Sequence, residues 1–297
     1  MSSVLYDEPG PNAKRRNVVY SVVFLAAAAV VVWWVWSELS DQGQLEWSKW
    51  KMFFTESDPW ENFLLPGLKN TVIAAAWATV IALPLAAVLG ISRLSDHAWV
   101  RWPSGTLVEF LRAIPVLLMM LFANEFYARF TDVDSEQRPL YAVITGLVLY
   151  NASVLAEIVR AGILSLPRGQ TDAAKAIGMR KGQMMRHVLL PQSVTAMLPA
   201  IVSQMVVIVK DTALGGALLG FAELLNSVRP MSNAYGANVI ASFTIVAVIF
   251  VLLNFALTTF ASWLEGRIRR GKKTTGAVVT GDLGEEAAAG GPGRGIV

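Results

Sequence analysis

The chain has 297 residues, of which 54% are hydrophobic and 16% are charged, and its formal net charge is +3. A mean hydropathy of +0.49 excludes an ordinary soluble domain, and the absence of cysteine excludes thiol catalysis, disulfides and cysteine-ligated metal sites. Lysine and arginine are dispersed between apolar stretches, so the positive charge does not indicate nucleic-acid binding. We therefore expect an all-α integral membrane protein in contact with membrane lipid.

Six apolar stretches of the sequence are long enough to cross a hydrocarbon core of roughly 30 Å, which takes about 20 helical residues. They comprise residues 17–39, 66–92, 103–127, 140–163, 193–222 and 237–264. Three basic residues precede the first stretch and three tryptophans lie near its far end, as in an aromatic belt. Its apolar core is too long for a signal peptide and no small-residue cleavage site follows, so we expect it to remain as a transmembrane helix.

The distribution of lysine and arginine predicts the orientation, because cytoplasmic loops retain positive charge during insertion. Residues 1–16 are then a cytoplasmic segment, and 40–65 form an extracytoplasmic loop. The connection after the fourth stretch carries five basic residues and the tail after the sixth carries six, so both are also expected to be cytoplasmic. Both termini are therefore predicted to lie in the cytoplasm. The tail, residues 266–297, becomes rich in Gly, Ala and Thr and is expected to be disordered.

The connection between the fourth and fifth stretches, residues 168–191, reads RGQTDAAKAIGMRKGQMMRHVLLP. Thr171 is placed to cap a helix whose first turn holds Asp172, Gly178 breaks that helix, and a second basic helix is predicted to stop at Pro191. The Ala, Gly and Met side chains of such a helix pair suit docking into a groove of another protein. The alternative is a basic amphipathic loop on the membrane surface.

The segment also carries a fixed pattern of an Asp-Ala-Ala triplet, a glycine and a Val-x-Leu-Pro ending. This pattern resembles the EAA signature of permease subunits of ATP-binding-cassette (ABC) importers, with Asp in place of Glu and Val in place of Ile. The resemblance implies a coupling helix that docks on a cytoplasmic ATPase subunit. The residues that it implicates are Gly169, Gln170, Asp172, Ala173, Ala174, Gly178, Met179, Arg180, Leu190 and Pro191.

Further matches, over about residues 66–265, occur at Gly67-Leu68-Lys69-Asn70-Thr71, at Phe110-Leu111-Arg112 with Pro115, and at Glu157-Ile158-Val159-Arg160-Ala161-Gly162. They resemble the importers of polar amino acids, of glutamate or glutamine type. Where that family has Gly-Thr before the proline, this chain has Ala113-Ile114. The resemblance implies a five-helix permease domain preceded by one extra helix.

The same resemblance implies the partners: a dimer of ATPase subunits, a second permease subunit that is identical or homologous, and an extracytoplasmic amino acid-binding protein. The sequence has no G-x-x-x-x-G-K-[ST] phosphate loop, so ATP and Mg²⁺ are expected on the ATPase partner and no cofactor, metal or catalytic residue on this chain. An ion-coupled secondary transporter is the alternative, because it also places charges in the membrane. A channel is disfavoured by the lack of a filter-like loop.

Lys210 and Asp211 are the charges inside the fifth stretch, ~25 Å along it if it is helical. With Thr212 they are candidates for the substrate pathway, and Gly215, Gly216 and Gly220 are expected to loosen the helix that follows. The alternative is an ion pair buried between subunits.

Other charged residues have a structural and a functional interpretation. Glu109 with Arg112, and Glu157 with Arg160, have the spacing of helical ion pairs. Arg112 remains a pathway candidate, whereas Glu157, Arg160 and Pro115 are candidates for a gate. The carboxylate of Glu125 is a further pathway candidate, although a simple exposed side chain beside a loop also fits.

Overall fold

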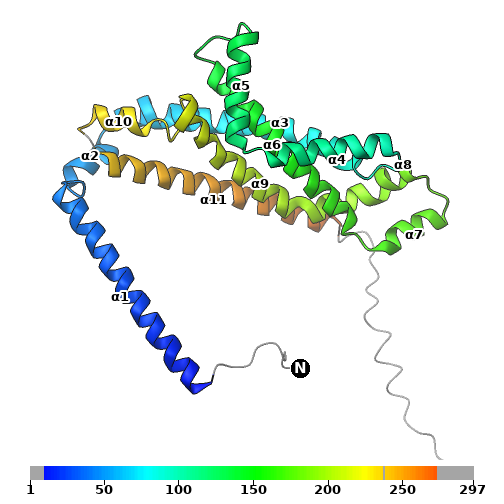
Figure 1. Cartoon of the computed structure of the whole chain (residues 1–297), viewed down its shortest axis with the longest axis horizontal. Helices are drawn as coiled ribbons and strands as arrows, with labels where there is room; N and C mark the ends of the chain where they lie inside the picture. Colours follow the sequence, from blue (N-terminus) through cyan, green and yellow to red (C-terminus); the bar gives the residue numbers. More distant parts are fainter. Residues whose placement is uncertain (1–9, 237, 273–297) are drawn as a thin grey trace, which may run out of the picture. The chain divides into compact units, whose positions relative to one another are not determined.

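The computed structural model describes residues 10–236 and 238–272, in which every regular element is a helix. The helices are shown in Figure 1, and the chain divides into two compact units. One unit contains the residues up to Thr71 together with Ala222–Ile249, and the other contains Val72–Phe221 together with the residues from Phe250 onward. The units are treated separately below.

The described part contains five helices that are long and apolar enough to span a membrane, or six if one bent pair is a single span. The predicted all-α membrane fold is therefore confirmed. Helix α1 (Pro11–Asp41) contains the first predicted span and has no buried residue. Helix α11 (Val239–Lys272) contains nearly all of the last span and continues into the predicted tail, whose residues 273–297 lie outside the described residues.

In the first unit, the connection predicted as a loop at 40–65 is folded. It contains α2 (Trp47–Thr55) and the π-helical turn η1 (Trp60–Leu64), which leads into α3 (Leu65–Ser92). The indole N–H of Trp60 donates to the Phe53 carbonyl at 2.9 Å, and the Ser227 hydroxyl donates to the Phe63 carbonyl at 3.0 Å. The ring of Tyr235, just after α10 (Val228–Ala234), meets the Phe63 ring edge-on. These contacts give the segment a small core of its own.

In the second unit, the predicted third span is not one helix. It consists of α4 (Ala98–Ala113) and α5 (Val116–Phe130), which meet at 97° (Figure 1). Ile114 and Pro115 both have extended backbone angles at the junction. A proline disfavours helical geometry in the residue before it and lacks the N–H that would continue the helix. Pro115 therefore breaks the span, although this chain has Ala113-Ile114 before the proline where the resembling family has Gly-Thr.

The core of the second unit forms where α6 (Arg138–Leu164) packs against α3, α5 and α9 (Leu190–Leu219). Small residues allow the close approach. A Cβ added to Gly215 would lie 2.1 Å from Cγ2 of Val143, and one added to Gly146 would lie 2.5 Å from Cγ of Met120. Close contacts at small residues are the common way for helices to associate in lipid.

The predicted loosening of α9 is wrong, because Gly215 and Gly216 are buried and lie within the continuous helix. Their role in the fold is close packing. The helix ends only at Gly220, where φ is 70°, a conformation that favours glycine.

Between α6 and α9 the chain forms α7 (Arg168–Ala176), α8 (Lys181–Met184) and the π-helical turn η2 (Met185–Leu189). Gly178 breaks the pair as predicted, with φ of 78°. Two details of the prediction are wrong. Helix α7 begins at Arg168, so Thr171 lies inside the helix and does not cap it. Pro191 lies in the first turn of α9 and does not end the second helix of the connection. Because η2 widens the helix, with the Leu190 N–H donating to the Met185 carbonyl, the chain passes Pro191 without interruption.

Candidate functional site

A cavity of about 560 Å³ lies where the α4–α5 break faces α6 and α9. Its polar lining consists of the side chains of Arg112, Tyr150, Gln204 and Asp211. Five further residues of apolar type and the proline of the break complete it: Ala113, Ile114, Val116, Val154, Val207 and Pro115. The structure thus brings together Arg112, Pro115 and Asp211, which the sequence analysis named for separate reasons and of which the outer two are 99 positions apart.

The break itself belongs to the cavity. Backbone that leaves the helix frees N–H and C=O groups, and within a membrane this is tolerated only where the backbone is buried in protein or lines a cavity. Residues 113–116 all line the cavity wall. The kink therefore supplies polar backbone to the same space that the charged side chains face.

The charges of the cavity are not neutralised by each other. In the described parts of the chain neither Arg112 nor Asp211 takes part in an ion pair within 4 Å. The amide of Gln204 is oriented by a 2.6 Å hydrogen bond from its Nε2 to Oδ1 of Asn151. A ligand with one anionic and one cationic group would find a guanidinium, a carboxylate and a fixed amide in one cavity.

The other predicted pathway residues lie elsewhere. Lys210 is exposed and absent from the cavity lining, as expected for adjacent residues of a helix. Thr212 is fully buried, and its hydroxyl donates to the Val209 carbonyl at 2.7 Å. Glu125 is exposed on α5 and forms an ion pair with Arg129 one turn later. None of these three side chains contacts the cavity.

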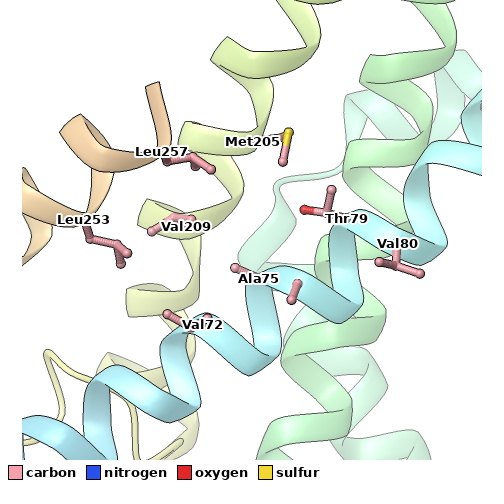
Figure 2. Close-up of a pocket in the computed structure, with 9 residues that line it drawn as sticks. Val72, Ala75, Thr79, Val80, Met205, Val209, Leu253 and Leu257 are labelled. Carbon is pink, nitrogen blue, oxygen red and sulfur yellow. The ribbon is translucent and has the colours of Figure 1, made fainter. Parts of the chain in front are cut away.

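A second hollow, of about 300 Å³, lies between α3, α9 and α11 (Figure 2). Figure 2 shows aliphatic side chains such as Val72, Val209 and Leu253 around it, with the Thr79 hydroxyl as a polar group among them. It offers no charge for a polar solute. The cavity at the α4–α5 break is therefore the better candidate site.

The gate candidates form a branched ion-pair network. Glu157 accepts from Arg160 at 2.9 Å, as the spacing predicted, and from Arg93, the residue after α3, at 2.7 Å. The predicted pair of Glu109 with Arg112 is wrong, because Glu109 pairs with Arg93 at 3.2 Å. Arg112 consequently remains available to the cavity. The sequence analysis did not single out Arg93, since nothing in the neighbouring sequence indicates that it would meet the carboxylates of Glu109 and Glu157.

The helix pair at 168–191 is attached firmly at one face and exposed at the other. Ala174 and Met184 are buried in a cluster with residues of α6 and α9. The amide of Gln192 donates to Gln170 at 3.1 Å, and the ammonium of Lys181 donates to the Leu94 carbonyl at 2.7 Å and to Asp96. The hydrogen bond from Lys181 holds the pKa of the Asp96 carboxyl below its usual value.

The exposed face includes Asp172, Ala173 and Gly178. A Cβ added at Gly169 or Gly178 would meet no atom within 4 Å, so these glycines are not required for packing inside the chain. The turn also presents Ile177, which is 77% exposed, a residue that the sequence pattern did not single out. Ile177 is therefore free to contact another protein on this face.

The fold and the sites define a multi-span helical membrane protein with a polar cavity between its helices and a long helical connection between α6 and α9. The family model described as binding-protein-dependent transport system inner membrane component matches residues 82–270. The chain belongs to this family of membrane permeases.

Two permease proteins are similar to most of this chain. The chain is 43% identical over 234 residues to the glutamate transport system permease protein GluD of Corynebacterium glutamicum, with 79% of this chain and 85% of GluD covered. It is 28% identical over 207 residues to the probable glutamine ABC transporter permease protein GlnP of Bacillus subtilis, with 69% and 93% covered. The predicted resemblance to amino acid ABC permeases of glutamate type is confirmed.

A solved structure supports the fold. The crystal structure of an amino acid ABC transporter with histidines matches with a TM-score of 0.61 at 24% identity, over 69% of this chain and 93% of that one. The helical architecture is therefore that of ABC permeases.

Proposed function

We propose that this chain is the transmembrane subunit of an ATP-driven importer that carries glutamate, or a closely related polar amino acid, across the cytoplasmic membrane. The single observation that carries the proposal is the cavity at the α4–α5 break, in which Arg112 and Asp211 face the same space without pairing. The 43% identity to a glutamate permease protein supports the substrate class.

The cavity has a group for each charged part of an amino acid. The guanidinium of Arg112 binds a carboxylate through two parallel N–H donors, and the carboxylate of Asp211 accepts from the α-ammonium group. Gln204 and Tyr150 supply neutral donors and acceptors for the rest of the solute. Charges in the membrane are costly unless they face water, protein or a ligand, which accounts for their position on a cavity wall.

ATP hydrolysis in this proposal belongs to a dimer of separate cytoplasmic subunits, which hold ATP and Mg²⁺, while this chain binds no cofactor. The face around Asp172, Ile177 and Gly178 docks on that dimer. Because Ala174 and Met184 of the same segment pack on α6 and α9, a movement of the docked segment is passed to the helix that carries Asp211.

The proposal also includes the orientation of the chain, its other partners and a gate. Both termini lie in the cytoplasm, and a second permease subunit completes the pathway. A binding protein delivers the amino acid from outside. The Glu157–Arg160 pair, with Arg93, holds the predicted cytoplasmic end closed between transport events.

The experiment is co-purification of the full chain with its nucleotide-binding subunit in mild detergent, followed by reconstitution with the binding protein. ATP hydrolysis is then measured with glutamate, glutamine, aspartate and a basic amino acid. The proposal predicts copurification and stimulation by acidic amino acids or their amides. Uptake driven by an ion gradient without ATP would instead indicate a secondary transporter and contradict the proposal.

A further inference from the structure

A second polar cavity, of about 270 Å³, lies between the end of α3, the first half of α4 and α6. Its lining includes three guanidinium groups, those of Arg93, Arg101 and Arg160, together with the Thr106 side chain and the carboxylate of Glu109. It is separate from the candidate translocation cavity, with which it shares no lining residue.

The charges of this cavity leave one arginine uncommitted. Arg93 and Arg160 are bound to the carboxylates of Glu109 and Glu157. Arg101 forms no ion pair within the described ranges; its guanidinium donates a 3.1 Å hydrogen bond to the Ser95 carbonyl and helps to lower the pKa of the Asp96 carboxyl. A guanidinium has five N–H donors, so most of those on Arg101 remain free. Three arginines and one glutamate line the cavity, so its lining carries a net positive charge.

The surroundings place this cavity at a membrane surface. Trp99 and Trp102 on the first turns of α4 are 77% and 70% exposed, and Phe110 is exposed two turns further on. Exposed tryptophans beside arginine are typical of the headgroup level of a bilayer. The positive-inside distribution of charge predicts that this end of α3 is on the cytoplasmic side.

We propose that this cavity binds the phosphate of an anionic phospholipid of the inner leaflet, with Arg101 as the main contact and Trp102 beside the glycerol region. Basic pockets between membrane helices on the cytoplasmic side are suited to anionic lipid headgroups. A soluble phosphate presents the same oxygen atoms to Arg101. The two exposed tryptophans favour the lipid, because they would otherwise contact water.

Gly105 explains why the cavity is open. A Cβ built on this residue would meet only Nε of Arg93, at 4.0 Å, so the glycine forms part of the wall without being required by close packing. A large side chain at this position would fill the cavity and leave every charge in place. This gives a variant that tests the cavity independently of Arg101.

The experiment measures phosphatidylglycerol binding to the purified full-length chain by native mass spectrometry. Arg101→Gln should weaken the binding about fivefold, the factor expected for one arginine at a lipid surface. Arg16→Gln removes the same charge from the basic cluster before the first span, outside the cavity, and should have no effect on this affinity. Binding of zwitterionic phosphatidylcholine should be equal in all three proteins.

Gly105→Leu should reduce phosphatidylglycerol binding as well, and it keeps the test decisive if Arg101→Gln fails to fold. Equal affinity in wild type, Arg101→Gln and Gly105→Leu would overturn the proposal. Displacement of the lipid by millimolar inorganic phosphate would also overturn it, because the site would then take its phosphate from solution. Retention of the lipid under phosphate, with loss in both variants, supports it.

Discussion

Arg112 of α4 and Asp211 of α9 line the same cavity, carry opposite charges and form no ion pair in the described parts of the chain. Two opposite charges that faced each other only to stabilise a helix contact would be expected to meet directly. Their separation leaves room for a solute with two charged groups. Pro115, at the 97° break between α4 and α5, lines the same cavity.

The contact between Gly215 and Val143 predicts a substitution with a matched rescue. Gly215→Ala should destabilise the subunit by about 1–3 kcal/mol, because its Cβ would lie 2.1 Å from Cγ2 of Val143. Combining it with Val143→Ala removes that atom and leaves only the Cβ contact of 3.4 Å, so stability should recover in part. Thermal unfolding in detergent measures the effect.

The control for this prediction is Gly182→Ala, since no atom lies within 4 Å of the added Cβ there. A variant Gly215→Ala as stable as Gly182→Ala would mean that α6 and α9 do not pack as closely as described.

Docking of the ATPase subunit should depend on Ile177. Ile177→Asp is predicted to weaken association about 30-fold, the size of a loss of about 2 kcal/mol at an interface anchor. Insertion in the membrane should be unchanged because the side chain is already exposed. Quantitative pull-down with the ATPase subunit makes the measurement, with Ile177→Val as the conservative control.

Substitution of Gly178 is a weaker test of the same interface, because φ of 78° strains any side chain other than glycine or asparagine. Gly178→Glu should abolish transport, whereas Gly178→Asn should retain part of it. If Ile177→Asp bound the ATPase as tightly as wild type, the exposed turn would not be the docking surface.

Glu223 predicts a pH dependence of stability in the first unit. Its carboxylate is fully buried and accepts the N–H groups of Leu225 at 2.8 Å and Asn226 at 2.7 Å. Burial raises the pKa of this carboxyl to about 7, although the two N–H groups favour the ionised form. The folded state therefore binds the proton more tightly than the unfolded state.

The resulting stability is fully present below the unfolded pKa of 4.5 and is lost as the pH rises toward about 7. Between pH 6 and pH 8 the free energy of unfolding should fall by about 1 kcal/mol. Glu223→Gln imitates the protonated form and should remove this part of the pH dependence. The same pH profile in wild type and Glu223→Gln would show that the carboxyl is ionised in the folded protein throughout.

Much of the fold could be predicted because lipid imposes a simple rule of length and polarity on each span. Gly178 also predicted the break within 168–191, since glycine frees the backbone locally. The break at Pro115 was not predicted, because the stretch 103–127 is apolar enough to be one span. The passage through Pro191 could not be predicted, because it depends on the widened turn at 185–189. The ion pair of Glu109 with Arg93 could not be predicted either, because the spacing of charges along one helix does not show which charges from elsewhere in the chain lie beside it.

Two of the four polar residues of the candidate site, Arg112 and Asp211, were predicted from the sequence, and their assembly into one cavity was not. A charge within an apolar stretch identified Asp211, and a family pattern identified Arg112 and Pro115. Periodicity alone did not distinguish Lys210 from Asp211, which differ by one position and point to different surroundings. Tyr150 and Gln204 were missed because single polar residues in a membrane helix are usually satisfied by neighbours.

The most direct test of the account is the amino acid-stimulated ATPase rate of the reconstituted importer carrying Asp211→Asn, Arg112→Gln or Lys210→Gln. Loss of one charge-assisted hydrogen bond is worth about 1.5–3 kcal/mol, so the first two variants should lower the stimulated rate about 10-fold or more. Assembly with the ATPase should be unchanged, and Lys210→Gln should stay close to wild type. Equal loss of assembly and stimulation in Asp211→Asn, or the same loss in Lys210→Gln, would contradict a substrate site at this cavity.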